Sequence, residues 1–244
     1  MLNYSDKIQV FLLHFAGGNY YSFQFLKPHF SGIFEACPIE LPGRGKRIRE
    51  DLIFDEKEAV ADYLKQIKSL RNGRPYLIYG HSMGASLGLR LTKKLEELGD
   101  APLRLIVSGN AGPGTGDNKC RSQMNEAELK IELRTMGGVP EEVLENKELY
   151  DFFIPIMKAD FSLLEKSEKN EGNKVDYKLE TPITALMGDS EETVDEIENW
   201  RNYTTGKCDF QVLSGNHFFI HEHAKRITEL FENTYVKDKM SHSY

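Results

Sequence analysis

The pentapeptide Gly80-His81-Ser82-Met83-Gly84 constrains the fold of this chain more than any other feature of its sequence. A short apolar run, 76–79, precedes it, and leucines at helical spacing follow it from Leu87. A serine can stand on so sharp a strand-to-helix turn only if the residues two before and two after it are tiny, because a Cβ at either place would strike a neighbouring strand or helix. We therefore predict that Ser82 is a nucleophile at the end of a strand. The alternative is a tight turn without a catalytic role.

Short apolar runs alternate with helical patterns along most of the chain. The runs that predict strands are 10–13, 36–41, 76–79, 103–107, 183–187 and 210–213. Helices are predicted after the serine motif and at 224–233, close to the end of the chain. Such alternation is typical of an α/β fold with a mostly parallel central sheet covered by helices. With 244 residues, the chain is expected to form a single domain, 1–244.

The segment 114–174 interrupts this alternation. It has little strand character, and short helices are predicted at 126–136, 141–149 and 152–164, with Gly137-Gly138-Val139-Pro140 as one of the breaks between them. We therefore expect an inserted helical lid here.

A serine hydroxyl needs a general base and an acid that orients the base, and in folds of this kind they follow in the order Ser, acid, His. His217 comes just after the last predicted strand and is the expected base. The acid is expected in the turn after the strand 183–187, where Asp189 or Glu191 could reach His217 Nδ1. An ordinary acidic helix start is the alternative reading of that turn.

An oxyanion hole is expected from two backbone N–H groups. One belongs to Met83, directly after the nucleophile, and the other to the loop Ala16-Gly17-Gly18 after the first strand, where we favour the Ala16 amide. Small residues in this loop would let the backbone approach a substrate oxygen closely. This chemistry requires no metal and no organic cofactor.

The charge balance limits the classes of partner. The chain has 31 Lys and Arg against 38 Asp and Glu, a net charge of −7, so no nucleic-acid or membrane partner is expected. Cys37, Cys120 and Cys208 lack metal-ligand or Cys-x-x-Cys spacing, and we expect free thiols in a reducing, cytoplasmic compartment.

In their order and spacing, these features resemble the type II thioesterases of nonribosomal peptide and polyketide synthase pathways, a branch of the α/β-hydrolases. The resemblance covers nearly the whole chain, and besides the serine motif it is carried by His14-Phe15-Ala16-Gly17-Gly18, Leu41-Pro42-Gly43-Arg44-Gly45, Met136-Gly137-Gly138-Val139-Pro140, Lys158-Ala159-Asp160-Phe161 and Gly215-Asn216-His217-Phe218-Phe219. It implies hydrolysis of acyl thioesters on the 4'-phosphopantetheine arm of acyl or peptidyl carrier proteins, which removes aberrant or stalled acyl groups. Ser82 and His217 fall on the family's nucleophile and base, and we expect a monomer.

Two positions depart from the family pattern. The family's Gly-x-x-Asp turn has Glu191 at its Asp position, so we rank Glu191 first as the acid and Asp189 second. His14 stands where the family has proline, which bears on the stiffness of the loop rather than on its role.

The expected helical lid would cover the catalytic residues, which suggests where a substrate would bind. Apolar residues of the expected lid are candidates for an acyl pocket, with packing of the lid on itself as the alternative for each: Met136, Val139, Phe152, Phe153 and Phe161.

The basic residues Arg44, Lys46, Arg47 and Arg49 are expected to contact the phosphate of the arm or an acidic carrier surface, or else to form a solvated loop. Competing functions are a medium-chain fatty acyl thioesterase, a general carboxylesterase, or a catalytically silent binding protein of the same fold.

Overall fold

A computed structural model describes residues 6–116, 119–171 and 176–241 of the chain. The expected lid, 114–174, therefore includes a few positions, 117–118 and 172–174, that lie outside the described residues.

The core of the structure is one six-stranded sheet in the order β2-β1-β3-β4-β5-β6, and all neighbouring strands in it run parallel. Its strands are β1 (Ile8–Leu13), β2 (Phe34–Ile39), β3 (Tyr76–His81), β4 (Arg104–Ser108), β5 (Ile183–Gly188) and β6 (Cys208–Leu213). All six predicted strands are confirmed, with ends that shift by at most two residues. Because the strands are parallel, the loops that carry Ala16, Ser82, Glu191 and His217 emerge at one edge of the sheet.

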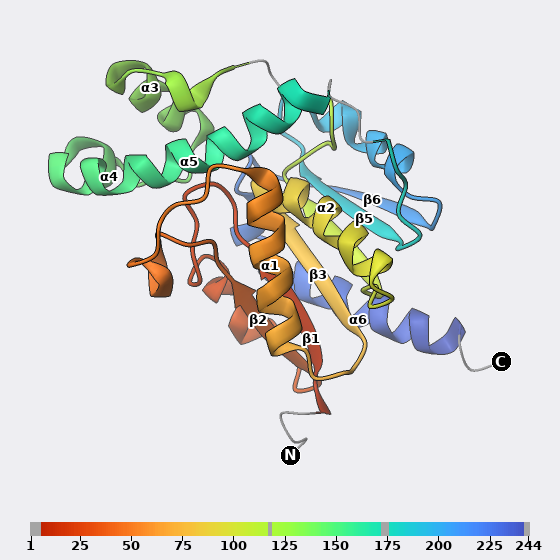
Figure 1. The fold of residues 1–244 in the computed structure, drawn as a ribbon. Helices are drawn as coiled ribbons and strands as arrows, with labels where there is room; N and C mark the ends of the chain where they lie inside the picture. Colours follow the sequence, from red (N-terminus) through yellow and green to blue (C-terminus); the bar gives the residue numbers. More distant parts are fainter. Residues whose placement is uncertain (1–5, 117–118, 172–175, 242–244) are drawn as a thin grey trace.

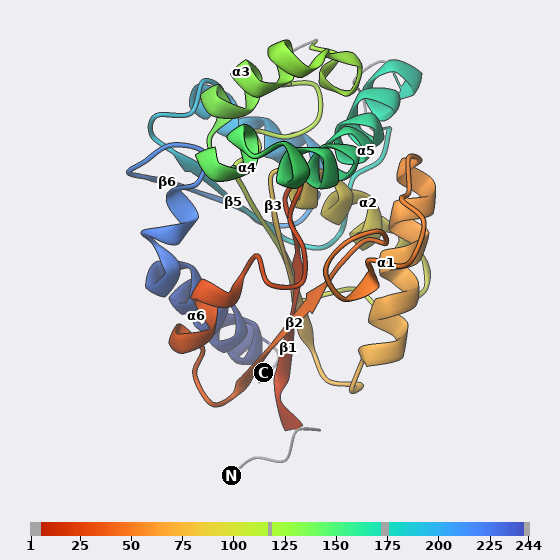
Figure 2. The same cartoon turned by 90° about the vertical axis from the view of Figure 1, so that its left-hand side faces the viewer.

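Helices cover both faces of the sheet (Figure 1). Figure 2 shows α1 (Glu56–Leu70) and α2 (Met83–Glu97) on one face and α6 (Ala224–Ser241) on the other. Alternate residues of β1 enter different cores: Phe11 and Leu13 pack on the α1 and α2 side, and Val10 and Leu12 on the α6 side. The two-residue period of a strand buried on both faces explains this division.

The sequence reasoning missed helix α1. Its signals were present: the Asp55 side chain accepts hydrogen bonds from the N–H groups of Lys57 and Glu58 at the helix start. Four residues at helical spacing point into the core, namely Ala59, Val60, Tyr63 and Ile67.

Several short 3-10 helices complete the connections. They are η2 (Gln24–His29), η3 (Gly45–Arg47), η4 (Arg121–Gln123), η5 (Val194–Tyr203) and η6 (Phe219–His221).

Three helices between β4 and β5 lie across the carboxyl edge of the sheet, at the top of Figure 2. They are α3 (Glu126–Met136), α4 (Glu141–Glu145) and α5 (Lys147–Glu171), and they share a small apolar core of their own. The expected helix 126–136 is confirmed, whereas α4 is shorter than expected and α5 begins at Lys147 rather than at 152. Among the described residues, none of the helices combines the length and the apolar character needed to cross a bilayer.

His14 is buried where β1 ends, and it joins three elements of the fold. Its Nδ1 donates to the Phe15 carbonyl at 2.9 Å, and its Nε2 accepts from the Leu41 N–H at 3.2 Å and from the Tyr63 hydroxyl at 3.1 Å. Burial, together with the nearby charge of Arg44, lowers the pKa of His14 to about 4. Hydrogen bonds of a neutral imidazole thus hold the start of the loop that follows β1.

We predict that replacing His14 with glutamine flattens the pH dependence of stability. The pKa of His14 lies near 4 in the folded chain and near 6.5 when unfolded, so its contribution is intact above pH 6.5 and is lost as the pH falls towards 4. Between about pH 7.5 and about pH 5 this amounts to about 2 kcal/mol. Urea unfolding at the two pH values should show that His14→Gln loses less stability than wild type by that amount. Equal losses would refute the assignment.

Candidate active site

Ser82 occupies a strained turn between β3 and α2. It has φ 54° and ψ −114°, and it is the only non-glycine residue with positive φ in the described part of the chain. A Cβ on Gly80 would lie 2.1 Å from the Gly84 carbonyl oxygen, and a Cβ on Gly84 would lie 2.2 Å from that of Leu13. The two glycines therefore let the turn fit between α2 and β1, as the motif predicts.

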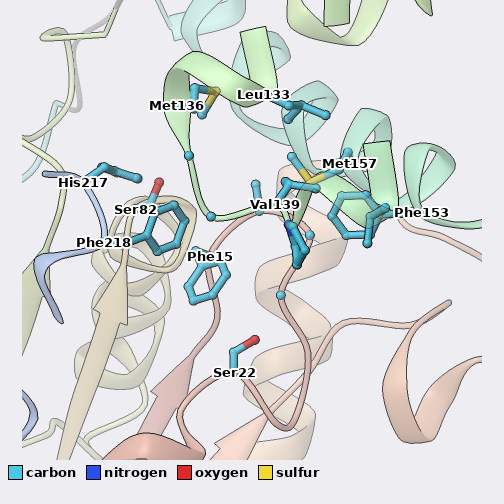
Figure 3. A pocket seen from close by; sticks show the side chains of 17 residues that line it. Phe15, Ser22, Ser82, Leu133, Met136, Val139, Phe153, Met157, His217 and Phe218 are labelled. Carbon is cyan, nitrogen blue, oxygen red and sulfur yellow. The ribbon is translucent and has the colours of Figure 1, made fainter. Parts of the chain in front are cut away.

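Glu191 is the carboxylate that meets His217. Its Oε2 lies 2.7 Å from His217 Nδ1, and its Oε1 accepts the Gly188 N–H at 2.7 Å. The Glu191 side chain is 7% exposed, so both contacts are shielded from water. With Nδ1 donating to this carboxylate, Nε2 is left as the nitrogen that can accept a proton. Figure 3 shows the His217 side chain pointing toward the Ser82 hydroxyl.

Asp189, the second candidate for the acid, is placed elsewhere. Its Oδ1 accepts the Gly215 N–H at 3.0 Å and the Ser190 hydroxyl at 3.0 Å, and these hydrogen bonds lower the pKa of its carboxyl. A Cβ on Gly188 would lie only 2.4 Å from the Gly215 carbonyl oxygen, which shows how closely the loops after β5 and β6 approach. Asp189 thus joins the loop after β5 to the loop after β6, which carries His217, and its hydrogen bonds are not made to His217.

His81, inside the serine motif, is a buried neighbour of His217. The ring centroids are 4.9 Å apart, and His81 Nδ1 lies 2.8 Å from the Ser108 hydroxyl. Burial, together with the neighbouring His217, lowers the pKa of His81 well below its usual value. His81 is therefore neutral and adds no positive charge beside His217.

The two expected oxyanion donors are the N–H of the residue after the nucleophile and an N–H of a loop that lines the same cavity as Ser82. Met83 is the first residue of α2, at a helix end where N–H groups point outward and favour negative charge. Ala16 lines the same cavity as Ser82. In its loop, the N–H of Gly17 is already bound to Asp160 Oδ2 and that of Gly18 to the Phe15 carbonyl, which leaves the Ala16 N–H as the candidate.

A cavity of about 220 Å³ opens beside Ser82 and His217 (Figure 3). The helices and loop above the sheet supply much of its apolar lining, and the loop after β1 closes another side. Besides the two catalytic candidates it is lined by Phe15, Ala16, Gly17, Gly18, Ser22, Leu133, Met136, Gly137, Gly138, Val139, Pro140, Val143, Phe153, Met157 and Phe218.

Three of the expected pocket residues, Met136, Val139 and Phe153, line this cavity, and two do not. Phe161 does not line it: its side chain is buried in the core formed by α3, α4 and α5, because it lies two turns, about 12 Å, further along α5 than Phe153. Phe152 is 60% exposed, since the residue before Phe153 on a helix points in a different direction.

Sequence reasoning left several lining residues unassigned, among them Phe15, Phe218, Leu133 and Met157. Phe15 and Phe218 are adjacent in sequence to Ala16 and His217, and their rings meet edge to face with centroids 5.1 Å apart. Their adjacency to these two residues could have identified them from the sequence. Met157 could have been identified by its four-residue spacing from Phe153, which puts both on one face of α5.

The prediction for the basic run after β2 is wrong for Arg44, which is 2% exposed and forms a bidentate ion pair with buried Asp160. Arg47 is paired with Glu50 and Asp62, and Lys46 lies over the ring of Tyr20. Arg44 and Arg47 are engaged within the molecule because Asp160 and Asp62, which are distant in sequence, fold onto them.

In the described ranges, no group of three His, Cys, Asp or Glu side chains is arranged to hold a metal ion.

Residues 8–235 match the thioesterase domain family. The gramicidin S biosynthesis protein GrsT of Aneurinibacillus migulanus is 31% identical over 91% of this chain and 86% of its own length. A Brevibacillus parabrevis protein named linear gramicidin dehydrogenase LgrE is 30% identical over 93% of this chain and 88% of its own.

Among solved structures, ClbQ from the colibactin NRPS/PKS pathway superposes with a TM-score of 0.85 at 27% identity, covering 96% of this chain and 99% of ClbQ. This chain combines these similarities with three features of its own site: a serine on a glycine-flanked turn, a histidine that contacts a carboxylate, and an apolar cavity beside them. The chain has the α/β-hydrolase fold and belongs to the thioesterase domain family.

Proposed function

We propose that this protein hydrolyses acyl thioesters from the phosphopantetheine arm of carrier proteins and so clears aberrant or stalled acyl groups from a nonribosomal peptide or polyketide synthase. The contact of Glu191 with His217, beside Ser82 at the mouth of an apolar cavity, carries the proposal. The name of GrsT and the pathway of ClbQ support the choice of synthase.

In the first half of the reaction, Ser82 Oγ attacks the thioester carbonyl while His217 Nε2 takes its proton. Glu191 stabilises the imidazolium that forms, through its contact with Nδ1. The N–H groups of Met83 and Ala16 bind the oxyanion of the tetrahedral intermediate. The intermediate collapses with breakage of the C–S bond, and His217 gives its proton to the departing thiol.

In the second half, His217 Nε2 takes a proton from a water molecule that attacks the acyl ester on Ser82. The same two N–H groups bind the second oxyanion, the bond to Ser82 Oγ breaks, and His217 returns the proton to this oxygen. The carboxylic acid then leaves and no further reactant is needed.

The cavity supports the proposed substrate class, and membership of the family supports the proposed partner. The cavity beside Ser82, about 220 Å³ and largely apolar, suits an acyl chain, and we take α3, α4 and α5 to be a lid inserted in a single domain. All three cysteines are free thiols, which fits a protein working in a reducing compartment such as the cytoplasm, where carrier proteins would be met. That the protein is a monomer is part of the proposal.

The name of LgrE raises a redox function as a second candidate. A nicotinamide dinucleotide site in an α/β fold normally has the pattern Gly-x-Gly-x-x-Gly between the first strand and a helix. Here β1 is followed by His14-Phe15-Ala16-Gly17-Gly18, whose Gly17 N–H is bound to Asp160. Hydrolysis is therefore the reaction that the site supports.

We predict that Glu191→Ala lowers kcat for a small acyl thioester by roughly 10²- to 10⁴-fold, because His217 loses the group that orients it and stabilises its charge. Asp189→Ala is the matched control, since it removes a nearby carboxylate that contacts only the loop. Its kcat should fall less than about tenfold. Release of the thiol can be followed with a chromogenic disulfide. The opposite ranking of the two variants would overturn the choice of Glu191.

We predict that the enzyme prefers acyl groups loaded on a carrier protein over the same acyl groups on coenzyme A or on simple oxygen esters. The panel should be compared by kcat/KM, with Ser82→Ala as the inactive control, and a fluorophosphonate should label wild type but not this variant. Equal or better turnover of the simple esters would favour a general carboxylesterase. A preference for longer fatty acyl groups, irrespective of the carrier, would favour a fatty acyl thioesterase.

We predict that Phe153→Ala raises kcat/KM for longer acyl chains, relative to acetyl, by about tenfold, because removal of this ring enlarges the cavity and a few added methylenes gain contact. Phe152→Ala is the matched control: the same substitution one residue earlier removes an exposed ring. A series of acyl thioesters of increasing length measures the effect. The same shift in both variants would show that the cavity does not select the chain.

A further inference from the structure

We propose that the buried ion pair between Arg44 and Asp160 positions the loop Ala16-Gly17-Gly18, here called the oxyanion loop. The shape of this loop then depends on the packing of α5 against it. The inference rests on the proposed function, since it requires the Ala16 N–H to act on the substrate. Arg44 and Asp160 are positioning residues in this proposal, as neither lines the cavity beside Ser82.

The Asp160 carboxylate serves two partners at once. Arg44 Nη1 lies 2.6 Å from Asp160 Oδ2, and Arg44 Nη2 lies 2.8 Å from Oδ1. The same Oδ2 accepts the Gly17 N–H at 2.7 Å, and Arg44 Nη1 also reaches the Gly18 carbonyl at 3.5 Å. The pair therefore holds the two residues that directly follow Ala16 by their backbone groups.

The arrangement is fixed because it is shielded from water. Arg44 is 2% exposed and Asp160 is 0% exposed. A bidentate guanidinium–carboxylate contact sets direction as well as distance, and loss of one partner would leave a buried charge uncompensated. The Gly17 N–H is thus bound to a carboxylate, that of Asp160, whose orientation is restrained by Arg44.

Helix α5 meets the same loop residue with a single stripe of side chains. At the position where Gly17 would carry a Cβ, the nearest atoms are Met157 Sδ at 2.3 Å and Phe153 Cζ at 2.7 Å. Phe153, Met157 and Asp160 follow one another at spacings of four and three residues, which places them on one face of the helix. One face of α5 therefore closes the acyl cavity and also binds the Gly17 N–H.

The rest of the loop is anchored from the sheet rather than from α5. Buried Glu40, which follows β2, accepts the Tyr20 N–H at 2.8 Å and the Lys46 N–H at 2.7 Å. Asp160 is the acceptor that α5 contributes to this loop. If α5 moved away, the wall of the cavity and the restraint next to Ala16 would be lost together, so that hydrolysis is confined to the docked state.

The decisive test compares carboxylate-to-amide changes in two of the helices above the sheet. Asp160→Asn breaks the pair with Arg44, and Glu132→Gln weakens a more exposed ion pair that α3 forms with Lys119 and Arg121. Both variants are assayed with the acetyl thioester of N-acetylcysteamine. Each is also tested with a trifluoromethyl ketone, whose adduct with Ser82 carries a tetrahedral oxyanion.

We expect Asp160→Asn to lower kcat by roughly 10- to 100-fold, with KM changed by less than about threefold. The reason is that the variant binds the oxyanion of the transition state more weakly, whereas its contacts with the ground-state substrate are nearly unchanged. Inhibition by the ketone should weaken by the same factor as kcat/KM. Glu132→Gln should change each quantity by less than about threefold. An unchanged kcat for Asp160→Asn, a change in KM alone, or an equal loss in Glu132→Gln would overturn the proposal.

A double variant, Arg44→Met with Asp160→Leu, guards against a folding defect. It removes both buried charges and also the acceptor of the Gly17 N–H, and such apolar replacement is commonly tolerated by the fold. Thermal unfolding checks that it is folded, and kcat should still fall by roughly 100-fold. Wild-type kcat in the folded double variant would refute the inference. Because the assay uses a small thioester, failure on carrier-bound substrates would refute the proposed function alone.

Discussion

Close contact between the Ser82 turn, β1 and α2 is the constraint on which the rest of the site depends. Ser82 holds a sparsely populated backbone conformation, which costs of order 1–3 kcal/mol and persists because the surrounding packing fixes it. Gly80 and Gly84 remove the atoms that would otherwise collide with Gly84 O and Leu13 O. The turn is thereby fixed against the end of β1, from which the oxyanion loop departs.

The parallel sheet brings the other groups to this turn. Each strand ends at the same edge, so loops separated by many residues meet there, and the approach of Gly188 to Gly215 is nearly as close as that of Gly84 to Leu13. That approach explains how a glutamate can occupy the acid position. Glu191 is longer than aspartate, and its second oxygen bonds back to the Gly188 N–H of its own turn, so that Oε2 meets His217.

Buried polar groups connect the sheet to the helices above its edge. His14 is kept neutral and joins β1 to the loop after β2 and to α1, while Arg44 and Asp160 join that loop to α5. Such groups are costly to bury unless they are fully bonded, so each one specifies which segments must be neighbours. The acyl cavity and the oxyanion loop therefore share one set of contacts.

The sequence by itself determined the strands, the Ser82 turn and the position of His217, because strand periodicity and the need for small residues at a sharp turn are local properties. It narrowed the acid to Asp189 or Glu191 but could not decide by geometry, since the choice depends on how two distant loops pack. It also placed Arg44 on the surface and Phe161 in the cavity. Only the tertiary structure decided these: Arg44 is buried because Asp160, far along the chain, folds onto it, and Phe161 lies beyond the cavity because α5 continues past its wall. The sequence gives the charge and the apolar character of each side chain, whereas long-range packing determines which other residues that side chain contacts.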